Sequence, residues 1–247
     1  MKLATGWHSE RLGEYVGIAR WGTFGVPVLL FPTAGGDAEE IERFHVIDAL
    51  GELIGAGRIK VYSCDSVAGR TWLKEGFGDR HRAWIQNQFH EFVARELVPA
   101  IREDCKMPDI EVIAAGSSIG AFNAVAVTCR YPEIFRAALG VSGTYDPTRF
   151  LTEGEMPGDL YFSSPIHFLP GLRGPQLDRL RTRRILIASG QGRAEDLGES
   201  WKMAKALGDA GVPNRVDPWG EEWHHDWPTW RRMFPLYLDE LTRPVTG

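Results

Sequence analysis

The chain has 247 residues, 43% of them hydrophobic and 25% charged, and its 28 Lys and Arg against 33 Asp and Glu give a net charge of −5 with His neutral. This composition is typical of a globular protein and argues against disorder. The mild acidity without basic runs argues against a nucleic-acid binder, and no segment approaches the ~18 apolar residues of a membrane span. The length is compatible with a single domain over residues 1–247.

The cysteines and the first residues bear on the cellular compartment. Cys64, Cys105 and Cys129 are odd in number, far apart and outside any C-x-x-C pair, which argues against a disulfide framework or a zinc site. The first ten residues contain no apolar run of the kind found in secretory signals. We therefore expect a cytoplasmic protein.

Short apolar strands alternate with helical segments along most of the chain. Residues 26–31 form a continuous apolar run, which predicts a strand buried on both faces. Residues 38–53 and 81–105 show the apolar spacing of amphipathic helices. The other predicted strands are residues 14–21, 58–63, 110–115, 135–141, 184–188 and 214–219, and the other predicted helices are residues 121–129, 196–210 and 229–241. This alternation predicts an α/β fold with a mostly parallel sheet flanked by helices on both faces.

Residues 144–183 interrupt the alternation. The segment contains five prolines, so we expect loops and short helices that form a small cap-like excursion within the domain. Its aromatic side chains favour an apolar or aromatic ligand group, although they could instead pack the excursion itself. These residues are Tyr145, Phe150, Tyr161, Phe162 and Phe168.

A candidate nucleophile stands between a predicted strand and a predicted helix. Residues 116–120, GSSIG, fit the pattern G-x-S-x-G with Ser118 at the centre. In such a nucleophile elbow the serine takes a strained backbone conformation at a sharp turn, and the glycines prevent side-chain clashes. An ordinary Gly/Ser turn is the alternative, but the strand–turn–helix context favours the elbow. Ser117 is the rival hydroxyl and is expected to point away from the pocket.

The base and the acid are expected in later loops. A hydrolase with this order of elements needs a histidine after the last strand, where either His224 or His225 could serve. The acid should follow the preceding strand, where Glu195 and Asp196 are candidates. Asp196 suits the N-cap of the next helix, so we favour Glu195, with Glu199 as the next candidate. The order serine, acid, histidine is that of α/β-hydrolases.

An oxyanion hole requires a second backbone N–H beside that of Ile119. The glycine-bearing loop of residues 31–36 is the expected source, because glycine lets the backbone approach a substrate closely. Ala34 is the preferred donor, and Thr33 and Gly35 are the alternatives.

Several segments together resemble an esterase family of α/β-hydrolases that includes esterase D (S-formylglutathione hydrolase), feruloyl esterase domains and the mycolyltransferase antigens. The His-Asp-Trp-x-x-Trp ending is the most specific of them and assigns the base to His225. The acid loop is longer than the Gly-x-x-Asp form of better-known members, a departure that bears on the choice of Glu195. The matching segments are residues 31–36, 116–121, 142–146, 164–165, 190–192 and 225–230.

The resemblance implies the α/β-hydrolase fold and a carboxylesterase-like serine hydrolase. The triad would be Ser118, His225 and Glu195, and the N–H groups of Ile119 and Ala34 would form the oxyanion hole. The partner would be a small-molecule ester, with no cofactor, metal or nucleic acid; self-association into a homo-oligomer is left open.

Other classes of function explain the residues less well. An acyltransferase could use the same triad with a different acceptor, and a non-catalytic binding protein could use the same fold. Serine, histidine and acid in the expected order disfavour the binding protein. A metal site at His224, His225 and Asp226 is disfavoured because adjacent histidines diverge and H-x-x-x-H spacing is absent. No G-x-G-x-x-G follows the first parallel strand, which disfavours nucleotide binding.

Overall fold

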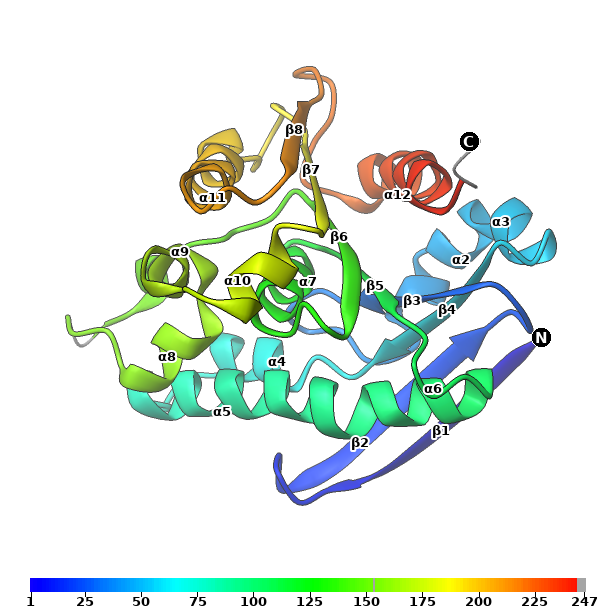
Figure 1. Ribbon diagram of the computed structural model, residues 1–247, viewed down its shortest axis with the longest axis horizontal. Coiled ribbons are helices and arrows are strands. Elements are labelled where there is room, and N and C mark those ends of the chain that lie inside the picture. The colour runs from blue at the N-terminus through cyan, green and yellow to red at the C-terminus, as the bar shows by residue number, and fades with distance from the viewer. Residues whose placement is uncertain (153, 244–247) are drawn as a thin grey trace.

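The computed structural model describes residues 1–152 and 154–243 and contains an eight-stranded mixed sheet (Figure 1). The strands are β1 (Lys2–Ser9), β2 (Glu14–Trp21), β3 (Val26–Phe31), β4 (Ile59–Cys64), β5 (Val112–Ser117), β6 (Phe135–Val141), β7 (Arg184–Ser189) and β8 (Asn214–Pro218). Their order is β1-β2-β4-β3-β5-β6-β7-β8. β1 pairs antiparallel with β2 and β2 with β4, whereas every other neighbouring pair is parallel. The α/β prediction with a mostly parallel sheet is confirmed.

Apolar side chains on both faces of the central strands explain why helices cover both sides. In β3, Val28 and Leu30 belong to one core, while Leu29 and Phe31 belong to the core on the opposite face. Successive side chains of a strand alternate between faces, so a continuous apolar run is buried only inside a three-layer fold.

One layer of helices contains α1 (Glu40–Arg43), α2 (Val46–Ala49), α3 (Gly51–Gly55) and α12 (Trp227–Thr242). Helices of the other layer are α4 (Val67–Leu73), α5 (Asp79–Phe92), the π-helical turn η1 (Val93–Leu97), α6 (Val98–Cys105), α7 (Ile119–Arg130) and α11 (Leu197–Asp209). Figure 1 shows α12 beside α2, and shows α5, η1 and α6 as one long helical run. Within the described residues, no helix combines the length and the hydrophobicity that crossing a membrane requires.

Two local predictions need correction. The single helix expected over residues 38–53 is divided into α1, α2 and α3. His45 interrupts the helical backbone between α1 and α2 with a φ of 60°, and Leu50, with a ψ of 1°, separates α2 from α3. The strand β1 was not predicted, since most of its residues are exposed and it carries little apolar patterning. It forms at the sheet edge by pairing with β2 over its whole length.

Residues 144–183 form short helices joined by loops, with residue 153 outside the described part of the chain. Leu177 and Leu180 of this segment are buried against α7, β7 and α11. The helices are η2 (Pro147–Phe150), α8 (Gly158–Ser163), α9 (Pro165–Phe168), η3 (Leu169–Gly171) and α10 (Pro175–Leu180).

The position of the site follows from the strand order. After β3 the chain adds β4 on one side, and it then returns to place β5 on the other side of β3. Phe31, the last residue of β3, lies opposite Gly116 of β5. The loops that leave these two strands therefore diverge at a topological switch point, where open parallel sheets form their ligand crevices.

Candidate active site

Ser118 lies at the sharp turn between β5 and α7. Its φ of 57° and ψ of −124° are strained for a residue with a side chain. A Cβ on Gly116 would lie 2.3 Å from the Gly120 carbonyl carbon, and one on Gly120 would lie 2.6 Å from the Phe31 carbonyl oxygen. Both motif glycines are thus required by close backbone packing. Ser117 is buried as the last residue of β5.

A cavity of about 160 Å³ opens at Ser118. Ile119 and Ala34, the two residues proposed for the oxyanion hole, both line it. Among the described residues, the remaining wall is mostly apolar and carries no charged side chain. Its other residues are Trp72, Leu73, Phe122, Thr144, Pro147 and Phe150. A neutral reacting group at Ser118 would therefore lie in apolar surroundings, where backbone dipoles interact strongly with a developing negative charge.

The loop that contains Ala34 is anchored by a buried carboxylate. Both the N–H and the hydroxyl of Thr33 donate to the Glu40 carboxylate, each at 2.7 Å. The Thr33 N–H is therefore occupied, which removes Thr33 as the alternative oxyanion donor. Burial raises the pKa of Glu40, and the two hydrogen bonds from Thr33 only partly offset it. Sequence reasoning missed Glu40, because an acidic residue in a helix pattern usually faces solvent.

Glu195 and His225 come together from the loops after β7 and β8. His225 Nδ1 lies 3.5 Å from Glu195 Oε2, and the Glu195 side chain is only 1% exposed. The carboxylate accepts a hydrogen bond from Ser142 Oγ at 2.6 Å and one from Ser189 Oγ at 3.3 Å. A buried carboxylate on one ring nitrogen of a histidine leaves the other ring nitrogen available for proton transfer.

His224, the rival base, serves the acid loop instead. Its Nδ1 accepts the Arg193 N–H at 2.9 Å, while the His225 N–H donates to the Arg193 carbonyl at 3.1 Å. A Cβ on Gly192 would lie 2.1 Å from His224 Nδ1, so the loop packs directly against this ring. The two adjacent histidines therefore have different partners, and it is His225 that faces Glu195.

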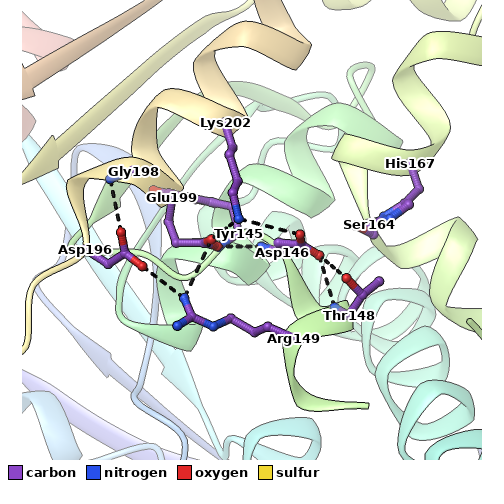
Figure 2. Close-up of polar contacts among 10 residues, drawn as sticks. All are labelled: Tyr145, Asp146, Thr148, Arg149, Ser164, His167, Asp196, Gly198, Glu199 and Lys202. Atoms are coloured by element: carbon purple, nitrogen blue, oxygen red, sulfur yellow. Dashed lines mark hydrogen bonds and ion pairs between the residues drawn. The ribbon is translucent and has the colours of Figure 1, made fainter. Parts of the chain in front are cut away.

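The other carboxylates near the acid have structural partners. Asp196 is the N-cap of α11, where its Oδ1 accepts the Gly198 N–H at 3.1 Å. The Glu199 carboxylate accepts the N–H groups of Tyr145 and Asp146 at 2.9 and 2.8 Å, as Figure 2 shows. Glu199 thereby fixes the turn that follows β6. Among the described residues, no group of three or more His, Cys, Asp and Glu side chains could hold a metal ion.

The family model described as "Putative esterase" matches residues 63–240, a span that contains Ser118, Glu195 and His225. The chain belongs to this esterase family. Comparison of the esterase with curated proteins gives no match.

Several solved structures are similar to the esterase in fold. A ferulic acid esterase has a TM-score of 0.75 at 18% identity, covering 98% of this chain and 98% of that one. An S-formylglutathione hydrolase from Agrobacterium tumefaciens has a TM-score of 0.67 at 13% identity, and the match covers 98% of this chain and 92% of that one. MPT51 from Mycobacterium tuberculosis has a TM-score of 0.70 at 16% identity, and the match covers 97% of this chain and 98% of that one. The esterase thus has the α/β-hydrolase fold.

Proposed function

We propose that the enzyme hydrolyses a carboxylic ester through an acyl-enzyme on Ser118. His225 takes the Ser118 hydroxyl proton as the oxygen attacks the ester carbonyl, and returns it to the leaving alcohol. Glu195 fixes the His225 ring and stabilises the imidazolium that forms. Water activated by the same histidine then releases the acid. The N–H groups of Ile119 and Ala34 bind the oxyanion in both steps.

The strained Ser118 backbone beside the cavity carries this proposal. Strain of this kind amounts to about 1–3 kcal/mol and persists only where surrounding structure enforces it, commonly at active sites. The conformation brings Ser118 into the cavity wall together with Ile119 and Ala34. The Glu195–His225 pair supplies the acid–base half of the mechanism.

The cavity supports an uncharged substrate group. Trp72, Phe122 and Phe150 give it large apolar surfaces, and none of the described residues that line it has a charged side chain to pair with an ionic acyl group. Its volume of about 160 Å³ suits a compact apolar or aromatic group better than a long chain. The proposed substrate is therefore a small neutral ester, and no step of this mechanism needs a cofactor.

A cytoplasmic location is part of the proposal. It is supported by Cys64, Cys105 and Cys129, all of which are free thiols. Cysteines that form no disulfide suit a reducing compartment.

Labelling with a fluorophosphonate followed by peptide mapping tests the nucleophile directly. We expect modification of Ser118 and loss of labelling in Ser118→Ala, together with loss of p-nitrophenyl acetate hydrolysis in a variant that still folds. Ser117→Ala is the matched control, because that serine is buried in β5, and it should retain most of the activity. Near wild-type turnover by Ser118→Ala would reject the serine mechanism.

A further inference from the structure

Ser142, the first residue after β6, lies between the two halves of the site. The preceding carbonyl, that of Val141, accepts the Ser118 N–H at 3.0 Å, and Ser142 Oγ donates to Glu195 Oε1 at 2.6 Å. Ser142 has a φ of 49°, in the left-handed region that non-glycine residues seldom adopt. Its own N–H donates to the Ala188 carbonyl at 2.8 Å, which ties this strained turn to β7.

The hydrogen bonds at Ser142 have only one consistent direction. Trp230 Nε1 donates to Ser142 Oγ at 3.0 Å, and an indole N–H can only donate. The ionised Glu195 carboxylate can only accept, so the single hydroxyl proton of Ser142 goes to Glu195. Ser142 is 3% exposed and Trp230 is 4% exposed, so water does not compete for either group.

The same tryptophan also contacts the base. The rings of Trp230 and His225 meet edge-to-face, with centroids 5.1 Å apart and an interplanar angle of 85°. His225 in turn lies 3.5 Å from Glu195 through its Nδ1. Glu195, Ser142, Trp230 and His225 therefore form a closed ring of contacts, in which displacement of one side chain disturbs the next.

We propose that Ser142 is a positioning residue for the catalytic acid, an inference that rests on the proposed triad. Its hydroxyl holds one carboxylate oxygen of Glu195, which directs the other oxygen toward His225, and Trp230 fixes the hydroxyl orientation. A buried carboxylate depends on such donors, because water no longer solvates it. The second donor, Ser189, is weaker, since its hydroxyl is 3.3 Å from Glu195 and is shared with the Gly190 carbonyl at 3.1 Å.

Two substitutions distinguish loss of the Ser142 hydroxyl from disturbance of the backbone. Ser142 does not line the cavity, so both Ser142→Ala and Ser142→Gly should lower kcat for p-nitrophenyl acetate about 10- to 100-fold with KM unchanged. Glycine relaxes the left-handed backbone, so Tm should be no lower in Ser142→Gly than in Ser142→Ala. Ser163→Ala, which removes another buried serine hydroxyl bonded to the Asp159 carbonyl, should retain wild-type kcat.

A double-mutant cycle tests the ring itself. Trp230→Phe keeps a ring against His225 but removes the N–H, so it should lower kcat several-fold by freeing the Ser142 hydroxyl to rotate. Adding it to Ser142→Ala should cause no comparable further loss, because the hydroxyl is already absent. Wild-type kcat in Ser142→Gly, or additive losses in the cycle, would overturn the proposal. Ser118→Ala assayed in parallel separates the two failures, since an active Ser118→Ala refutes the triad and not merely the role of Ser142.

Discussion

Glu195 and Asp196 are adjacent carboxylates with opposite surroundings. Ala194, which precedes them, has a φ of 64° and turns the chain sharply before Glu195. The Glu195 side chain is buried and faces Ser142 and His225, whereas Asp196 is exposed at the start of α11 and accepts the Gly198 N–H. Two consecutive residues thus suit different roles: the Glu195 carboxylate suits catalysis and the Asp196 carboxylate suits helix capping.

This difference predicts separate effects on activity and stability. Glu195→Gln should lower kcat by several orders of magnitude with little change in Tm, because the amide cannot stabilise the imidazolium; replacing the triad carboxylate by its amide costs ~10⁴-fold in kcat in trypsin-like proteases. Asp196→Asn keeps a good N-cap. It should retain activity, and its free energy of unfolding should change by no more than about 0.5 kcal/mol, with a correspondingly small change in Tm. Steady-state kinetics and thermal unfolding measure both, and the roles would be reversed if Asp196→Asn alone abolished turnover.

At the scale of elements, the site depends on how closely α7 approaches β3. The first turn of α7 rests on the carboxyl end of β3, with Gly120 against the carbonyls of Phe31 and Pro32. This contact sets the distance between Ile119 and Ala34, the two residues proposed to share one oxyanion. Catalysis of this type depends on placing donors to within a fraction of an ångström.

Gly120→Ala should therefore damage both activity and stability. The added Cβ would lie 2.6 Å from the Phe31 carbonyl oxygen and 2.8 Å from that of Pro32, so α7 must move away from β3. We expect kcat to fall by about 10²-fold or more, the scale of losing one oxyanion donor. Gly208→Ala in α11 is the matched control, because its Cβ meets nothing within 4 Å; it should leave kcat unchanged and raise Tm slightly. Equal effects of the two substitutions would contradict this explanation.

The sequence predicted those elements in which local pattern and tertiary contact agree. The apolar strand before Ser118 and the glycines around it are adjacent in the sequence and also form the turn in the structure, so the elbow could be predicted. The break at His45 could not, because apolar spacing continues through residues 38–53 while the backbone does not. Ser142 and Glu40 also escaped prediction, since their partners lie far along the chain or on another element.

At the scale of the whole molecule, the two ends of the parallel strands differ in what they carry. The carboxyl ends of β3, β5, β6 and β7 lead into the proposed catalytic loops. At the amino ends, Arg183 donates to the Glu111 carboxylate at 3.2 and 2.6 Å and to the Pro132 carbonyl at 2.7 Å. These three residues come just before β5, β6 and β7, so this cluster joins neighbouring strands at the end farthest from Ser118. We expect it to affect stability and not catalysis.

Glu111→Gln tests this separation and has a defined pH dependence. Burial alone would raise the pKa of Glu111, but the hydrogen bonds and charges of Arg183 and Arg179 outweigh it and lower the pKa. A carboxylate with a lowered folded-state pKa stabilises the protein above its unfolded value of about 4.3, and that contribution is lost as the pH falls through the folded value.

Glu111→Gln should therefore lower Tm by a few degrees at pH 7, corresponding to about 1–2 kcal/mol, while kcat for p-nitrophenyl acetate stays at the wild-type level. The two Tm values should converge as the pH falls through the lowered pKa of folded Glu111, because the wild-type carboxylate then becomes protonated as well. Asp178→Asn, which removes an exposed carboxylate paired with Arg181 at 3.4 Å, is the control and should change Tm little at either pH. A Tm difference that widens on acidification would contradict the lowered pKa of Glu111. A loss of turnover without loss of stability would show that the amino ends of the strands act on the site.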